Sequence, residues 1–496
     1  MANASSNFRP PVASPGSLSW GPQPLTPPGE SALPVPVLIG IGLLCALGGV
    51  SVAVAGLNAL FLSVGVIGCL LVLYDFRIGV VALVVLMPIS ASQLFPHEIL
   101  GIKGLNPLNV LLLGTLVSCV FHMSADRRFV KLVPAPLLWL YLVPIVAAGF
   151  LGSRHVGEIA ADFFRLHQIT FHDQAGYLRD LLLKPLFLVG FAILMGAATV
   201  RSQKPERFLY PLIVSIWVMC LIAIVYFALS SMSLDQISGE FDRGFFSPLG
   251  LHSNELGRMY SSAYGMLLFA WAQSRSPKLS MPLLISMGAL VVALVLTFSR
   301  GSFLAFILVN VLFVLWRGSA KTVLVAGLAA LALLVVLPGA VFVRVQLGLG
   351  NFDLDALTAG RLDHIWLPVL PELWRSPIFG NGLGAVMWTD AMRSGHMILV
   401  GHPHNAYLEA LLDLGIVGFV LLCAYWVHVW KGFRRLAGDT SLAPELRGLY
   451  QGAAASLLAL AVSNMVGSSL MPVTDQVFLW MAVGMMYGQR LGRAGH

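Results

Sequence analysis

Charged residues are scarce in this sequence. Only 11% of its 496 residues are Asp, Glu, Lys or Arg, whereas 57% are hydrophobic. A soluble chain carries roughly 25% charged and about 45–50% apolar residues. The scarcity of charge therefore excludes a soluble globular protein, a disordered protein and a fibrous one. Apolar runs of about 18 residues or more recur along most of the chain, so we predict an all-α, polytopic integral membrane protein.

Cysteine is also rare. The five cysteines all lie inside apolar runs, and no two of them form a Cys-x-x-Cys pair. An odd number of thiols on lipid-embedded helices argues against a disulfide framework and against a zinc site. We interpret these cysteines as small buried hydrophobic side chains.

The distribution of apolar runs divides the chain into four parts. Residues 1–34, rich in Pro, Ser, Gly and Asn, are expected to form a disordered cytoplasmic tail. A transmembrane bundle is predicted at 35–341, a large outer loop at 342–403 and C-terminal transmembrane helices at 404–496. Twelve to fourteen helices are expected, because one or two of the fourteen apolar segments could be re-entrant. The segments are 35–55, 58–73, 78–95, 106–123, 132–151, 181–200, 208–230, 256–272, 281–298, 302–317, 321–341, 404–430, 448–468 and 474–490.

Lysine and arginine predict the orientation, because the cytoplasmic loops of membrane proteins are enriched in them. With the N-terminus inside, 18 of the 30 basic residues but only 6 of the 23 acidic residues fall on the inner side. Both termini are then cytoplasmic. The three longest linkers, 152–180, 231–255 and 342–403, face the outside.

Twelve basic residues nevertheless fall on the outer side, together with nine of the twelve histidines. Ten of the twelve are arginines, whose planar, permanently charged fork suits phosphate oxygens. We therefore expect extracytoplasmic chemistry on an anion. For most of them the alternative is an ordinary salt bridge with one of the 17 carboxylates on that side. The twelve are Lys103, Arg154, Arg165, Arg179, Lys184, Arg243, Arg258, Arg300, Arg344, Arg361, Arg375 and Arg393.

Arg300 lies in the sequence Phe-Ser-Arg-Gly (298–301), between two apolar runs. A single helix over 281–317 would measure about 55 Å, too long for one membrane crossing. We therefore predict a break at Ser299–Gly301, which Gly301 permits. An ionisable residue held at the membrane boundary is a candidate functional residue. The alternative is an arginine that reaches toward lipid head groups.

Arg361 begins a stretch whose apolar residues follow helical spacing over 362–373. We predict a short amphipathic helix on the outer face, bent or shortened at Pro368, with Arg361 near its positive N-terminal end. A surface salt bridge with Asp363 or Asp355 is the alternative for Arg361. The following Gly-rich segment, 376–384, lacks the Lys-Ser/Thr pair of a phosphate-binding loop and follows no strand. We expect it to be a tight turn that returns the chain to the membrane.

His404 directly precedes Asn405, a good N-cap for the long helix predicted after it. The positive potential near a helix N-terminus favours a neutral imidazole, which a general base requires. Glu409 and Asp413, one turn apart, are candidates to orient a histidine or to fix an arginine. A histidine that merely caps or packs is the alternative. Secondary candidates for phosphate contact are Arg165, Arg179 and Lys184, in or after a loop whose segment 158–170 is amphipathic enough for an interfacial helix.

The order of these motifs resembles the bacterial O-antigen ligase and O-antigen polymerase superfamily. The resemblance runs over roughly 295–425. It rests on Phe-Ser-Arg-Gly (298–301), Gly-Arg (360–361), Ser-Pro-Ile-Phe-Gly-Asn-Gly-Leu-Gly (376–384) and His-Pro-His-Asn-Ala-Tyr-Leu-Glu-Ala-Leu-Leu-Asp-Leu-Gly-Ile-Val-Gly (402–418). It implies a GT-C-like glycosyltransferase fold. By the same resemblance Arg300 and Arg361 would hold a pyrophosphate, His404 would be the catalytic histidine, and Asn405 matches the motif without assigned chemistry.

The same resemblance implies the reaction. A ligase of this kind transfers a polysaccharide from undecaprenyl pyrophosphate to a sugar hydroxyl of the lipid A core, at the periplasmic face of the bacterial inner membrane. No cofactor or metal is expected, because arginines can neutralise the phosphates, and no nucleic acid is expected as partner. An O-antigen polymerase and a protein O-oligosaccharyltransferase remain open as alternatives, as does a secondary transporter for an anion.

Overall fold

A computed structural model describes residues 57–90, 106–123, 133–166, 169–230, 244–318, 360–467 and 469–494, with short pieces between these ranges. The predicted tail at 1–34 and most of the predicted segments 35–55 and 321–341 lie outside the described residues. The chain divides into two units at residue 60. The contacts given below are those within the second unit, residues 61–496.

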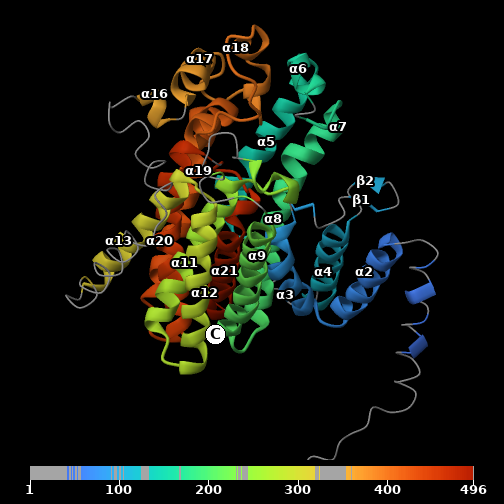
Figure 1. The fold of residues 1–496 in the computed structure, drawn as a ribbon, viewed down its shortest axis with the longest axis vertical. Coiled ribbons are helices and arrows are strands. Elements are labelled where there is room, and N and C mark those ends of the chain that lie inside the picture. Colours follow the sequence, from blue (N-terminus) through green and yellow to red (C-terminus); the bar gives the residue numbers. More distant parts are fainter. Residues whose placement is uncertain are drawn as a thin grey trace, which may run out of the picture. The chain divides into compact units, whose positions relative to one another are not determined.

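Helices make up almost all of this unit (Figure 1). The exception among the described residues is a pair of two-residue antiparallel strands, β1 (Glu98–Ile99) and β2 (Ile102–Lys103). The long helices are α2 (Leu57–Tyr74), α3 (Phe76–Leu86), α4 (Pro107–Met123), α5 (Val143–Gly152), α8 (Lys184–Arg201), α9 (Leu209–Leu229), α11 (Ser253–Gln273), α12 (Pro277–Leu296), α13 (Arg300–Arg317), α19 (Ala406–Ala437), α20 (Pro444–Ser463) and α21 (Val477–Ala494).

Seven helical stretches of the described residues are long and apolar enough to cross a membrane, and three further apolar helices are shorter. These ten coincide with ten of the predicted apolar segments, and α11 and α21 coincide with two more. The predicted polytopic, helical fold class is thereby confirmed. The seven are 137–158, 174–201, 205–229, 277–296, 300–317, 406–437 and 444–466.

Small residues let α11 and α20 approach each other closely. A side chain at Gly452 would place its Cβ 2.4 Å from the carbonyl oxygen of Gly265, and one at Gly448 would place it 2.3 Å from that of Phe269. Membrane helices associate through such small residues, because lipid supplies no hydrophobic drive between helices. The close pairing carries the first turn of α11 and the end of α20 to the same place in the fold.

The segment 360–405, predicted to face the outside and therefore named the outer segment, folds onto the starts and ends of membrane helices. Figure 1 shows its short helices α17 (Leu367–Val369) and α18 (Asp390–Arg393) at the same end of the unit as α6 (Ala161–Arg165) and α7 (Gln174–Tyr177). The predicted helix over 158–170 is shorter than expected, since α6 has five residues. The short helix α16 (Leu354–Leu357) precedes the outer segment along the chain.

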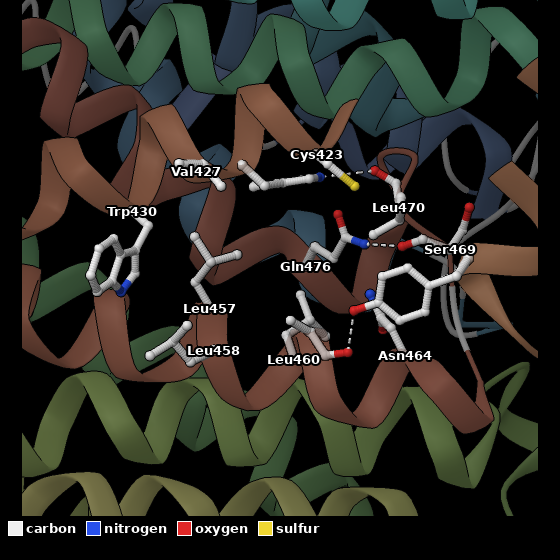
Figure 2. Close-up of a pocket in the computed structure, with 13 residues that line it drawn as sticks. Cys423, Val427, Trp430, Leu457, Leu458, Leu460, Asn464, Ser469, Leu470 and Gln476 are labelled. Atoms are coloured by element: carbon white, nitrogen blue, oxygen red, sulfur yellow. Dashed lines mark hydrogen bonds between the residues drawn. The ribbon is translucent and has the colours of Figure 1, made fainter. Parts of the chain in front are cut away.

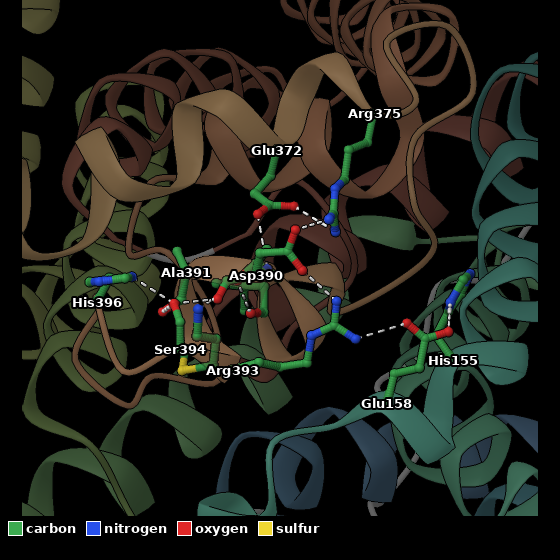
Figure 3. A network of polar contacts seen from close by, with 12 residues as sticks. His155, Glu158, Glu372, Arg375, Asp390, Ala391, Arg393, Ser394 and His396 are labelled. Atoms are coloured by element: carbon green, nitrogen blue, oxygen red, sulfur yellow. Dashed lines mark hydrogen bonds and ion pairs between the residues drawn. The ribbon is translucent and has the colours of Figure 1, made fainter.

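A network of ion pairs ties this outer segment to the helical turn 153–158 that follows α5 (Figure 3). Arg393 contacts Glu158 at 3.4 Å and also pairs with Asp390. Asp390 in turn pairs with Arg375, whose Nη1 lies 3.1 Å from a carboxylate oxygen of Glu372. Arg375 and Arg393 therefore form ordinary loop salt bridges, the alternative raised for most of the outer arginines.

The Gly-rich segment 376–384 is a turn, as predicted, but it does not lead directly into a membrane helix: it packs against α19, and residues 385–405 follow before α19 begins. The amide of Gly382 donates to the carbonyl oxygen of Asp413, and that of Ile416 donates to Pro377. Gly415 interrupts the regular helix with φ +64°, and a Cβ there would lie 2.4 Å from the backbone of Ile378. A backbone this close, with positive φ, requires glycine.

Candidate functional site

The two helices that flank Arg300 are separated by a short break. α12 ends at Leu296 and α13 begins at Arg300, which confirms the predicted interruption. The residue that takes the left-handed conformation is Phe298, with φ +47°, and not Gly301. Positive φ is uncommon outside glycine and costs about 1–3 kcal/mol. Gly301 has a different role, because a Cβ there would lie 3.3 Å from Cγ2 of Val466.

The break also packs against the first turn of α11. A Cβ at Gly257 would lie 2.4 Å from the Ser302 hydroxyl and 3.0 Å from that of Thr297. The Ser302 hydroxyl donates to the Ser299 hydroxyl at 2.9 Å, and both serines are buried. The start of α13, and with it Arg300, is held in place by these contacts.

Arg361 reaches the same turn from the outer segment. Its Nη1 donates to the carbonyl oxygen of Val466, in the single helical turn 464–466 that follows α20. Asp355, proposed as a salt-bridge partner for Arg361, accepts the amides of Gly360 and Asp363 and so shapes the turn before the helix. Arg361 and Gly301 thus meet at Val466.

The predicted amphipathic helix after Arg361 is present over 362–374, with a change of helix type at each proline. Ile365 and Val369 are buried, as the predicted apolar face requires. The indole nitrogen of Trp366 donates to the carbonyl oxygen of Pro403 at 2.9 Å. This bond joins the helix that starts at Arg361 to the segment that carries His402 and His404.

His404 has an unusual backbone and a close histidine neighbour. Its φ is +54°, and with Phe298 it is one of two non-glycine residues of the described chain with positive φ. Its amide donates to Nδ1 of His402 at 3.3 Å, and the two ring centres are 4.1 Å apart. Asn405 then caps α19, as predicted, since its side chain accepts the amides of Tyr407 and Leu408 at 3.1 Å.

Both imidazoles are held neutral. Desolvation by the surrounding protein, followed by the charges of Arg258, Arg361 and His252, lowers the pKa of His402 to about 4. For His404, desolvation is again the largest cause, followed by His402, Arg361, His252 and Arg258, and these hold its pKa further below the ordinary value. A neutral imidazole can accept a proton at neutral pH. The outcome matches the expectation, but its main cause is desolvation and neighbouring cations, not the helix terminus.

Asp413 has a different role from the predicted one. Its two carboxylate oxygens accept the amides of Gly384 and Ala385 at 2.9 and 3.0 Å. It therefore fixes the Gly-rich turn and does not orient a histidine or hold an arginine. The spacing of Glu409 and Asp413 on one helix does not indicate that backbone amides of a distant loop approach Asp413, so this role could not be predicted from the sequence.

The three secondary candidates pair with carboxylates. Arg165 contacts Asp162 at 2.9 Å, and both side chains are exposed. Arg179 and Lys184 share Asp180, at 2.9 and 2.7 Å. These contacts are ordinary salt bridges of the loop, the simpler interpretation of the three residues.

Arg258, one of the twelve basic residues predicted on the outer side, also lies at this site, although it lies within an apolar run and in no recognised motif. Its Nε contacts Asp475 at 2.5 Å, and its charge acts on both His402 and His404. His252, whose Nδ1 accepts the amide of Asn254 at the start of α11, belongs to the same surroundings.

An apolar cavity lies between α19 and α20, beside this site. Figure 2 shows its lining side chains, which enclose about 340 Å³. Its polar members, Asn464, Ser469 and Gln476, cluster at one end, and Asn464 belongs to the helical turn whose Val466 binds Arg361. Tyr407 closes the cavity by donating to the carbonyl oxygen of Ala461. The cavity is therefore an apolar slot whose polar end lies at the turn that binds Arg361.

Comparison with known proteins agrees with the motif order. Residues 283–423 match the family model described as O-Antigen ligase. The matched range includes Arg300, Arg361 and His404. A search of the curated proteins found no match. The motifs, the helical membrane fold and this match together support a relation to the O-antigen ligase superfamily of glycosyltransferase-like membrane enzymes, carried by residues 283–423.

Proposed function

We propose that this protein transfers a glycan from a polyprenyl pyrophosphate carrier, undecaprenyl pyrophosphate, to a sugar hydroxyl of a lipid A core at the outer face of the bacterial inner membrane. The observation that carries the proposal is the meeting of Arg361 and Gly301, next to Arg300, at Val466, with the neutral His402–His404 pair within electrostatic range of Arg361. Arginine cations can stabilise the charge of a departing phosphate, while a neutral histidine beside them can accept a proton.

Arg300 and Arg361 act on the leaving group in this proposal. As the glycosidic bond breaks, its electron pair stays with the pyrophosphate oxygen, and negative charge grows there. Fixed arginine donors aimed at that charge stabilise the transition state, and loss of one such donor typically costs about 10²–10³ in rate. The arginines hold the phosphates without a metal.

His404 acts on the acceptor. Its neutral imidazole takes the proton of the acceptor hydroxyl as that oxygen attacks the anomeric carbon, a contribution of about 10²–10⁴ in rate. Attack opposite the leaving group inverts the anomeric configuration. The strained backbone at His404, with φ +54°, fits a side chain fixed for this purpose.

The apolar cavity beside the site supports a lipid-linked donor. It is lined by Trp426, Trp430 and leucine side chains, and its polar end lies at Asn464, two residues from the carbonyl that binds Arg361. A hydrocarbon chain in this slot would leave its phosphates near Arg361. An anion transporter would place its ionisable groups near the membrane midplane, and the family match adds no support for transport.

The test is transfer of a labelled glycan from its undecaprenyl pyrophosphate carrier to purified lipid A core by the purified protein. We expect transfer by the native protein and its loss in Arg300→Ala, Arg361→Ala and His404→Asn. Asparagine tolerates positive φ, so His404→Asn removes the imidazole while keeping the backbone. Arg165→Ala, which alters an exposed salt bridge, is the matched control. Full transfer by all three site variants would refute the proposal.

The choice of acceptor separates this reaction from the alternatives. A polymerase would extend a second lipid-linked glycan, and a protein O-oligosaccharyltransferase would modify a protein. We propose the lipid A core because the motif order resembles the ligases. Parallel reactions with each acceptor, and the same labelled donor, will identify the class of acceptor directly.

A further inference from the structure

A buried ion pair lies behind the candidate site. Nε of Arg258, on the first turns of α11, contacts a carboxylate oxygen of Asp475 at 2.5 Å. The side chains are 9% and 1% exposed, and Asp475 lies in the helical turn 474–476, just before α21. Removing two charges from water costs more than an isolated pair usually returns. Because this ion pair is not expected to stabilise the apolar bundle, we look for another role for it.

The guanidinium of Arg258 packs against the turn that Arg361 binds. A Cβ at Gly467 would lie 2.8 Å from Nη1 of Arg258, while the adjacent residue, Val466, accepts the hydrogen bond from Arg361. Two arginines, from α11 and from the outer segment, therefore contact neighbouring residues of one turn. Taken as a whole residue, Arg258 is 7% exposed, whereas Arg361 is only partly buried. Arg258 therefore lies on the buried side of the turn, and Arg361 lies nearer to the solvent.

Arg258 also lies beside the histidine pair, and its charge acts on both His402 and His404. The other positive groups that face these imidazoles are Arg361 and His252. The negative groups close to Arg258 are Asp475 and, one turn earlier on α11, Glu255. Asp475 orients Arg258 through Nε, the inner edge of the guanidinium, so that its terminal nitrogens remain on the side of residue 467.

We propose that Arg258, held by Asp475, is a positioning residue of this site. Its buried guanidinium supports the 466–467 turn on which Arg361 is anchored, and it adds a fixed positive charge beside His402 and His404. Arg258 does not touch the substrate. The electrostatic half of this inference stands without the proposed reaction, whereas its consequence for turnover rests on the proposed function.

The electrostatic half is tested without any assay of activity. The pH midpoint of hydrogen–deuterium exchange at the imidazole C2 carbon, followed by mass spectrometry, reports the protonation of each histidine. Removing a neighbouring positive charge makes the imidazolium less unfavourable, so Arg258→Gln raises the midpoint of His402 by about one pH unit, which corresponds to a differential interaction of about 1.4 kcal/mol. Arg258→Lys, which keeps the charge, leaves most of the native midpoint.

A matched control lies at the other end of the same helix. Arg275, just after α11, has its amide bonded to Glu445 and lies about 25 Å from Arg258 along the helix axis. Arg275→Gln removes the same charge from the protein and leaves the midpoints of His402 and His404 unchanged. An unchanged midpoint in a folded Arg258→Gln protein, or an equal shift in Arg275→Gln, would overturn the inference.

Arg258→Gln removes the guanidinium that pairs with the buried carboxylate of Asp475, so the protein could fail to fold. The double variant Arg258→Gln/Asp475→Asn removes both charges while retaining side chains of similar shape that can still hydrogen bond. We expect it to fold, to show a raised midpoint at His402, and to transfer glycan about 10- to 100-fold more slowly, with a raised KM for the donor because Arg361 loses its support. A normal midpoint and normal turnover in this variant contradict the role of Arg258.

The two readouts separate the two proposals. If the native protein shows no glycan transfer but Arg258→Gln raises the histidine midpoint, the proposed function fails and the electrostatic role of Arg258 stands. If transfer is present and Arg258→Gln leaves both midpoint and turnover unchanged, the proposed function stands and Arg258 has no positioning role.

Discussion

Arg361 is anchored to Val466 by a hydrogen bond from its guanidinium to the backbone carbonyl, across 105 residues of sequence. The side chain of the same valine lies against Gly301, the residue after Arg300. One helical turn thus contacts both the Arg361 side chain and the backbone next to Arg300, which the sequence places in separate motifs. This relationship yields the first prediction.

Arg361→Lys keeps the positive charge but loses the planar fork that reaches both the Val466 carbonyl and a phosphate. We expect glycan transfer to fall by about tenfold or more in Arg361→Lys, and by about 10²–10³ in Arg361→Ala. Initial rates at saturating donor are the measurement, and Arg165→Ala, which loses an exposed ion pair, should retain the native rate. Equal rates in native protein and Arg361→Ala would contradict a role for this anchor.

The lowered pKa values of the histidines predict the pH dependence of transfer. Because the pKa of His402 is lowered to about 4 and that of His404 is lowered further, both rings stay neutral through the neutral range. We expect the rate to be insensitive to pH between 6 and 7.5 and to fall only in strongly acidic solution. A decline of the rate centred near pH 6.5, the ordinary pKa of histidine, would show that the catalytic base is not the desolvated His404.

The same shift predicts how stability depends on pH. In the unfolded chain the pKa of a histidine is about 6.5, whereas in the folded protein the pKa of His402 is about 4. Between these values the unfolded chain binds more protons, so stability falls as the pH falls through this window. His402→Gln should weaken this dependence. Thermal unfolding in detergent at a series of pH values measures it, with Ser394→Ala, an exposed position, as the control.

Gly415 tests the packing of the outer turn on α19. Its φ of +64° and the 2.4 Å approach to Ile378 leave no room for a side chain. We expect Gly415→Ala to destabilise the protein by about 2 kcal/mol or more, through strain and backbone displacement. Gly401→Ala is the matched control, because no atom lies within 4 Å of a Cβ there. Similar unfolding temperatures for the two variants would argue against the tight contact.

Asp413 tests the attachment of the Gly-rich turn. Asp413→Ala leaves the amides of Gly384 and Ala385 without their acceptor, which typically costs about 1–3 kcal/mol for each buried donor. We expect a clear loss of thermal stability. Asp162→Ala, at an exposed ion pair, should change stability by less than about 1 kcal/mol. A stable Asp413→Ala protein would mean that these two bonds contribute little.

Local patterns in the sequence predicted several features of the site correctly. The excess length of the apolar stretch 281–317 required a break before Arg300, and Asn405 before an apolar helical pattern required a helix start. These features depend on residues close together in the chain. The residue that bends at the break, Phe298, could not be predicted, because its positive φ is imposed by packing around it and not by its own preference.

The roles of Asp413 and Arg258 also escaped prediction, for the same physical reason. Asp413 binds amides 28 and 29 residues away, and Arg258 contacts a carboxylate 217 residues away. Neither pairing follows a helical period, so no spacing rule indicates it.

The sequence by itself determined that this chain is a bundle of membrane helices, because repeated apolar runs of that length are stable as helices in lipid. It also determined where the long helices begin and end near the motifs, through capping residues and glycines. Only the tertiary structure decided that Arg258, Gly301 and Arg361 meet at residues 466–467, and that His402 and His404 lie beside them. Such meetings depend on how closely α11 and α20 can approach, which is a property of two packed surfaces and not of either segment alone.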